Sequence, residues 1–131
     1  MAGVTTMQRV YWPLMHLDPK VAEAIANSDR CVVCGRAYPL NRHHIVPRSA
    51  GELYENGRKA EKRLIVLCGF GSNLSDADGR LYCHGRAHHR MLHFRNDRGR
   101  LEFLFTDEPT RYAAALEADG WMPLEVARWA S

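Results

Sequence analysis

The chain carries two adjacent histidines, His43 and His44, followed by Ile45, Val46 and Pro47. Neighbouring residues on a β-strand point to opposite faces, so in an extended segment the two imidazoles separate. One can then bind a metal ion while the other accepts a proton, since an unperturbed imidazole titrates near ~6.5. The pair indicates a metal ligand beside a base, and the remaining ligands must come from elsewhere in the chain.

Four cysteines form a second chemical group: Cys31, Cys34, Cys68 and Cys83. The two-residue gap in the first pair lets both thiolates reach one ion, and Gly35 permits the turn behind them. Four thiolates complete the closed tetrahedral shell of a structural zinc site. The alternatives are a redox pair and free buried thiols. We expect a cytoplasmic protein, because neither signal peptide nor membrane span is indicated, and a reducing cytoplasm favours metal binding over disulfides.

Four further histidines follow Cys83, in a segment whose pattern predicts a helix over residues 83–94. At 3.6 residues per turn, His84 and His88 lie one turn apart on the apolar side, where they can share a metal ion. The opposite side faces solvent or nucleic acid and carries Arg86, His89, Arg90 and His93. For His84 and His88 the alternative is a hydrogen-bonded pair in the core, and the adjacent histidines at 43 and 44 favour the metal site.

These residues need elements to position them. Residues 40–46 and 64–68 read as two short strands, joined by a polar loop over 48–63 that can carry a short helical turn. A second, glycine-rich loop spans 69–79.

Elements on both sides complete the chain. Residues 1–17 suggest an apolar arm, and Asp18 and Pro19 start a helix that ends near 27–29. After the middle segment come a strand over 101–105, a helix from Pro109 to Gly120 capped by Thr106 or Asp107, and an apolar tail over 121–129. The extension carries acidic residues but no histidine or cysteine, and we expect it to be structural rather than catalytic.

Charge is unevenly distributed along the 131 residues. Residues 30–100 hold 14 Arg/Lys and 6 Asp/Glu, a net charge of 14 − 6 = +8, whereas the whole chain has +3. A basic middle segment favours polyanions through counterion release, and an arginine-rich soluble surface is the alternative. The length fits one domain.

Taken in order, four motifs resemble one family: Cys31-x-x-Cys34, His43-His44-Ile45-x-Pro47, Leu64-Ile65-x-Leu67-Cys68-Gly69 and Cys83-His84-Gly85-x-x-His88. The chain is similar to HNH endonucleases with the ββα-metal (His-Me finger) core, in the zinc-supported form common in phage and bacterial mobile elements. The resemblance covers roughly residues 30–95, and the joint occurrence of the motifs is more specific than any one alone.

The resemblance implies a small α+β fold with the ββα-metal core over 30–95. With the N-terminal arm and helix over 1–29 and the strand-helix extension over 96–131, we expect a single domain. It implies that His43, His84 and His88 bind a catalytic divalent ion and that His44 is the general base. The implied activity is hydrolysis of DNA phosphodiester bonds. The ion's identity is left open among Mg²⁺, Mn²⁺, Ni²⁺ and Zn²⁺, although imidazole ligands suit zinc, nickel, copper and iron better than magnesium. The oligomeric state is left open.

One position departs from the family. Five residues before Cys68, where the family has an asparagine that orients the base, this chain has Arg63. Arginine offers only hydrogen-bond donors, so it cannot accept from an imidazole N–H; Asn73 or a backbone carbonyl could take that role. Arg63 could instead contact phosphate, as could Arg48, Arg86 and Arg90. Two alternatives to the nuclease follow: a zinc-stapled nucleic-acid-binding module of weak or no activity, and a protein-interaction or redox role for the cysteines.

Overall fold

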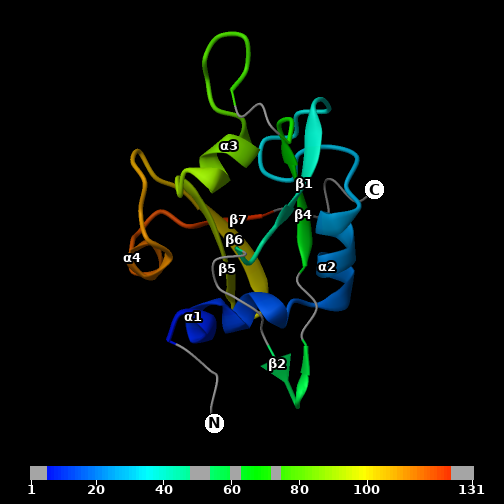
Figure 1. The fold of residues 1–131 in the computed structure, drawn as a ribbon, viewed down its shortest axis with the longest axis vertical. Helices are drawn as coiled ribbons and strands as arrows, with labels where there is room; N and C mark the ends of the chain where they lie inside the picture. The colour runs from blue at the N-terminus through cyan, green and yellow to red at the C-terminus, as the bar shows by residue number, and fades with distance from the viewer. Residues whose placement is uncertain (1–5, 48–53, 60–62, 72–74, 125–131) are drawn as a thin grey trace.

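The computed structural model describes residues 6–47, 54–59, 63–71 and 75–124, and has a mixed α and β architecture with three small antiparallel sheets (Figure 1). Its elements, in chain order, are α1 (Thr6–Met15), α2 (Pro19–Ala26), β1 (Leu40–His44), β2 (Tyr54–Glu55), β3 (Arg58–Lys59), β4 (Leu64–Cys68), α3 (Cys83–His88), β5 (Leu92–Asp97), β6 (Arg100–Phe105), α4 (Tyr112–Leu116) and β7 (Met122–Pro123).

The sheet that matters most for the site pairs β1 with β4, and its register places His43 opposite Ile65. β4 is the apolar run predicted from the sequence, and Ile65 and Leu67 are fully buried. α2 and α3 both pack against β4 and lie on either side of this sheet (Figure 1). The β1–β4 sheet and α3 thus bring residues 43, 44 and 83–88 to one region of the molecule.

The start of α2 is as predicted. Asp18 is the N-cap, its carboxylate accepts a hydrogen bond of 2.9 Å from the backbone N–H of Lys20, and Pro19 is the first helical residue. Asn27 caps the other end, within the range predicted. The apolar side of the helix contributes Ala22 and Ile25 to the core.

The helix predicted over residues 83–94 is wrong in its second half, because α3 ends at His88. Arg90 has a positive φ of 58°, the N–H of Met91 donates to the carbonyl of Arg86, and that of Arg90 donates to the carbonyl of Ala87. These two hydrogen bonds form a Schellman motif, which turns the chain out of the helix. The chain then continues as β5, so the boundary expected at residue 95 falls inside a strand.

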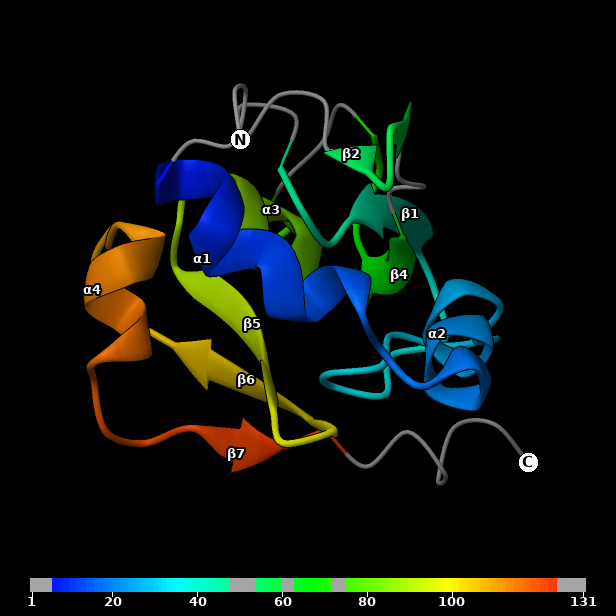
Figure 2. The same ribbon diagram turned by 90° about the horizontal axis from the view of Figure 1, so that it is seen from below.

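β5, β6 and β7 form a separate sheet, and the predicted strand over 101–105 is part of it. β6 pairs with β5 and β7, not with the β1–β4 sheet. α1 and α4 pack against β5, and Figure 2 shows α1 lying across this strand. Residues 92–124 are therefore a second layer of the same core, which includes Leu92, Phe94 and Leu101.

Two smaller predictions need correction. The expected apolar arm contains a helix, α1. The polar loop over 48–63 contains a two-stranded hairpin, in which Asn56 and Gly57 both have positive φ and form the turn that an Asn-Gly pair favours.

The C-terminal helix is shorter than predicted: α4 begins after Arg111 and ends at Leu116, with no side-chain cap. The backbone bond from Thr110 N–H to the carbonyl of Arg90 holds the preceding segment outside the helix. None of the helices in the described part of the chain is long and apolar enough to cross a membrane.

Candidate metal centres

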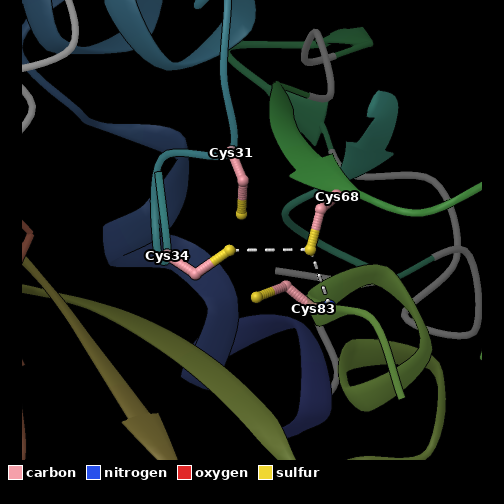
Figure 3. Close-up of side chains that lie close together, drawn as sticks. All are labelled: Cys31, Cys34, Cys68 and Cys83. Atoms are coloured by element: carbon pink, nitrogen blue, oxygen red, sulfur yellow. Dashed lines mark hydrogen bonds between the residues drawn. The ribbon is translucent and has the colours of Figure 1, made fainter. Parts of the chain in front are cut away.

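Four cysteine sulfur atoms converge on one point, where the α2–β1 loop, the end of β4 and the start of α3 meet (Figure 3). The four sulfurs lie within 4.8 Å of one another. Cys31, Cys68 and Cys83 are buried, and Cys34 is exposed. This cluster is compatible with a structural metal such as Zn²⁺, as the cysteine count predicted.

The backbone around the cluster is shaped for thiolate ligands. Gly35 has a φ of 80°, and its N–H donates to the carbonyl of Cys31 over 2.8 Å, which closes the turn between the first two cysteines. The backbone N–H of Cys83 donates to the Sγ of Cys68 over 3.2 Å, and the sulfurs of Cys34 and Cys68 are 3.7 Å apart (Figure 3). An N–H aimed at a sulfur stabilises the thiolate form that binds metal.

The thiols of the cluster compete for protons. Hydrogen bonds from Cys31 and Cys68 hold the pKa of Cys34 well below the usual value for a thiol. Hydrogen bonds with Cys31 and Cys34 raise the pKa of Cys83 well above it. Neighbouring thiolates repel, so all four ionise together only if a cation offsets their charge.

Three histidines form a second cluster, between β1 and α3. His43 from β1 and His84 and His88 from α3 each offer a ring nitrogen, and these nitrogens lie within 4.8 Å of one another. The Nε2 atoms of His84 and His88 are 3.0 Å apart, and the His43 ring centroid lies 5.2 Å and 5.4 Å from theirs. This separation allows the three nitrogens to bind one ion.

The ring of His84 is oriented by the backbone. Its Nδ1 lies 3.3 Å from the carbonyl oxygen of Phe70, so an N–H at Nδ1 donates to that oxygen and leaves the Nε2 lone pair for a ligand bond. Gly69 makes the approach possible, because a Cβ there would lie 2.9 Å from the Cβ of His84 and 3.1 Å from that of Tyr82. Gly69 thus joins the cysteine cluster, through Cys68, to the histidine cluster.

Burial favours the neutral form of two of the clustered imidazoles, His43 and His84. Burial, followed by the charges of His84 and His88, lowers the pKa of His43 to about 3. Burial also lowers the pKa of His84. Neutral imidazole is the form that binds a metal ion, so the lone pairs of His43 and His84 are available at neutral pH.

The other predicted site residues that the structure describes are not members of the three-histidine cluster. His44 is half-buried at the end of β1, on the strand face opposite to that of His43. Arg63 precedes β4, and its carbonyl accepts a 3.1 Å hydrogen bond from the N–H of Ile45. Arg86 places its guanidinium 5.4 Å from the ring centroid of Phe105. Arg48 and Asn73 lie outside the described residues.

The outward direction predicted for His93 is wrong, whereas His89 is exposed as expected. His93 is buried on β5, and its Nε2 lies 2.9 Å from the carbonyl oxygen of Arg90. The carbonyl of Phe70 was not among the predicted site groups. Its only signal in the sequence was Gly69, the residue after Cys68, which marks a close approach of backbone to a neighbouring element.

Comparisons of the chain with family models, with curated proteins and with solved structures find no match. The two clusters are therefore interpreted from their own geometry and chemistry.

Proposed function

We propose that this protein is a metal-dependent endonuclease that hydrolyses DNA phosphodiester bonds, of the HNH type that the sequence resembles. The observation that carries the proposal is the three-histidine cluster, in which ring nitrogens from β1 and α3 lie within 4.8 Å of one another. In the proposal, β1, β4 and α3 are the two strands and helix of a ββα-metal core. The cysteine cluster, loaded with zinc, holds β4 and α3 together.

The residues divide the chemistry between them. His43, His84 and His88 would hold the divalent ion, whose chemistry is to polarise a phosphate oxygen and stabilise the leaving 3′ oxygen. His44, next to His43 but on the other face of the strand, accepts the proton of the attacking water. An imidazole suits this step because its ordinary pKa lies close to neutral pH. The carbonyl of Phe70 keeps the His84 ring in position.

DNA as the substrate is supported by charge. The net charge of residues 30–100 is 14 − 6 = +8, and both clusters lie in this segment. Arg42 and Arg90 are exposed, and Arg86 is partly exposed at the end of α3. A basic surface around a hydrolytic centre concentrates the phosphate backbone there.

The proposal is tested by nicking of supercoiled plasmid. The zinc-loaded chain is incubated with added Mg²⁺, Mn²⁺, Ni²⁺ or Zn²⁺, together with His44→Ala and the matched control His89→Ala, which removes an exposed imidazole outside the cluster. Nicking in at least one metal is expected for the unsubstituted chain and for His89→Ala. In His44→Ala we expect a loss of about 10²–10⁴-fold, the usual contribution of general base catalysis.

A second candidate is a zinc-stapled nucleic-acid-binding module without useful catalysis. The observation that favours it is Arg63, which stands where the family has the asparagine that orients the base. DNA binding without nicking in any of the four metals would favour this candidate and reject the endonuclease.

A further inference from the structure

A group of aromatic side chains, which we call the aromatic cluster, consists of the exposed Tyr38 and Phe70 and the partly buried Tyr82. The rings of Tyr38 and Phe70 meet edge to face at 5.8 Å, and those of Phe70 and Tyr82 at 6.4 Å. Tyr38 is 74% exposed and Phe70 is 40% exposed. Exposed aromatic side chains leave apolar surface in contact with water. Where several such side chains are neighbours, the patch is typical of a binding site.

The aromatic cluster is fixed to the body of the protein. The N–H of Gly69 donates to the carbonyl of Pro39 over 2.9 Å, which ties the residue before Phe70 to the residue after Tyr38. The Tyr38 and Phe70 rings are nearly perpendicular, at 83°, so Phe70 contacts Tyr38 without a stacked arrangement. Most of the Tyr38 surface is left to solvent, because this residue is 74% exposed.

The aromatic cluster is also joined to the proposed hydrolytic centre. The carbonyl of Phe70 is the group that lies 3.3 Å from Nδ1 of His84. Tyr82 directly precedes Cys83 and His84 at the start of α3. The backbone that carries the Phe70 and Tyr82 rings is therefore continuous with, or bonded to, the residues of the histidine centre.

Arginines are interleaved with the rings along the chain, in the order Arg36, Tyr38, Arg42, Phe70, Arg80 and Tyr82. The three arginines are exposed. The guanidinium carbon of Arg36 lies 5.1 Å from the Tyr82 ring centroid, and Arg36 also forms a long pair of 3.9 Å with Asp76. Aromatic faces for bases together with cations for phosphates are the combination that binds single-stranded nucleic acid.

We propose that the aromatic cluster stacks an unpaired nucleobase of the DNA strand bound at the histidine centre, with Tyr38 as the stacking residue. The substrate class is then single-stranded or locally opened DNA, as at a bulge, flap or junction, and not an uninterrupted duplex. This inference rests on the proposed function for the strand's position, but the stacking itself is measurable without hydrolysis.

The test uses an oligonucleotide that contains one 2-aminopurine, whose fluorescence falls when it stacks on an aromatic ring. The zinc-loaded chain is titrated with this probe in single-stranded form and within a full duplex, with no other divalent metal added. Tyr38→Ala removes the ring, Tyr38→Phe keeps it, and Tyr54→Ala is the matched control because Tyr54 is a 59% exposed tyrosine on the β2–β3 hairpin.

We expect quenching of the single-stranded probe by the unsubstituted chain, Tyr38→Phe and Tyr54→Ala. Tyr38→Ala should lose the quenching and bind at least about fivefold more weakly, the lower end of the effect of one stacked base, with little change for duplex. Equal affinity and quenching in Tyr38→Ala and Tyr54→Ala would overturn the inference.

The outcomes separate this inference from the proposed function. Quenching that depends on Tyr38, without nicking in any metal, supports the stacking site and rejects the endonuclease. Nicking that is retained while Tyr38→Ala behaves like Tyr54→Ala supports the endonuclease and rejects the stacking site. Zinc content and far-ultraviolet circular dichroism of each variant check that the fold is retained.

Discussion

Replacing Gly69 with alanine should damage both clusters, because this residue lies where they meet. Its φ is +134°, a conformation that residues with a side chain rarely adopt. The added Cβ would lie 2.9 Å from the Cβ of His84. That atom is attached directly to the backbone of α3, so a change of side-chain rotamer cannot move it away. The strain must therefore shift either the start of α3 or the end of β4.

The expected cost follows from two contributions. A side chain in a disfavoured backbone conformation costs about 1–3 kcal/mol, and overpacking against a fixed neighbour adds about 1–3 kcal/mol. Denaturant unfolding of the zinc-loaded Gly69→Ala chain should show a loss of this combined size. A shift of the Phe70 carbonyl also disturbs His84, and such supporting contacts are worth about 10–100-fold in metal affinity, measurable by nickel titration.

Gly79→Ala is the matched control, since Gly79 also has a positive φ, of +79°, but an added Cβ there meets nothing within 4 Å. It should show the backbone contribution alone and keep the affinity of the histidine centre. The reasoning is refuted if Gly69→Ala costs no more stability than Gly79→Ala and binds nickel as tightly.

Three further perturbations test other parts of the structure. Cys83→Ser and Cys34→Ser should both release zinc, measured by elemental analysis, and the buried Cys83→Ser should unfold more of the chain; full zinc occupancy in both would contradict the cluster. Glu102→Ala breaks the 2.7 Å pair with Arg95 and should cost about 1.5–3 kcal/mol in denaturant unfolding, whereas a loss under about 0.5 kcal/mol would make the pair no more than a surface contact. Burial, followed by the nearby Tyr11, raises the pKa of Tyr112 above the ordinary value of about 10. The unfolded chain therefore loses the Tyr112 proton at a lower pH than the folded chain, and the free energy of unfolding falls as pH rises above about 10. The unfolding free energy should then fall by up to about 1.4 kcal/mol per pH unit, and Tyr112→Phe should fall less steeply; equal slopes would show that Tyr112 does not titrate on unfolding.

Sequence patterns predicted the elements whose signals are local. Asp18 before Pro19 marks the start of α2, since an aspartate side chain caps a helix and proline suits its first residue. The apolar run of β4 was predicted with its observed ends. The spacing of His84 and His88 also predicts that they lie on one side of α3, and in the structure they lie together with His43.

The errors arose where tertiary contacts override local pattern. Met91 and Phe94, three residues apart, fit a continued helix by spacing, but Leu92 and Phe94 fit an alternating strand equally well. The end of α3 depends on Arg90 in a positive-φ conformation usually taken by glycine, so the sequence gives little warning of it. The hydrogen-bond partner of His84 is a backbone carbonyl, for which Gly69 was the only signal in the sequence.

The central claim is that His43, His84 and His88 form one metal centre, separate from the cysteines. It is tested most directly by calorimetric titration of Ni²⁺ into the zinc-loaded chain, with His84→Ala and His89→Ala as the comparison. We predict one nickel ion per chain in addition to the zinc, lost in His84→Ala and retained in His89→Ala. Absence of that ion, or its retention in His84→Ala, would contradict the account.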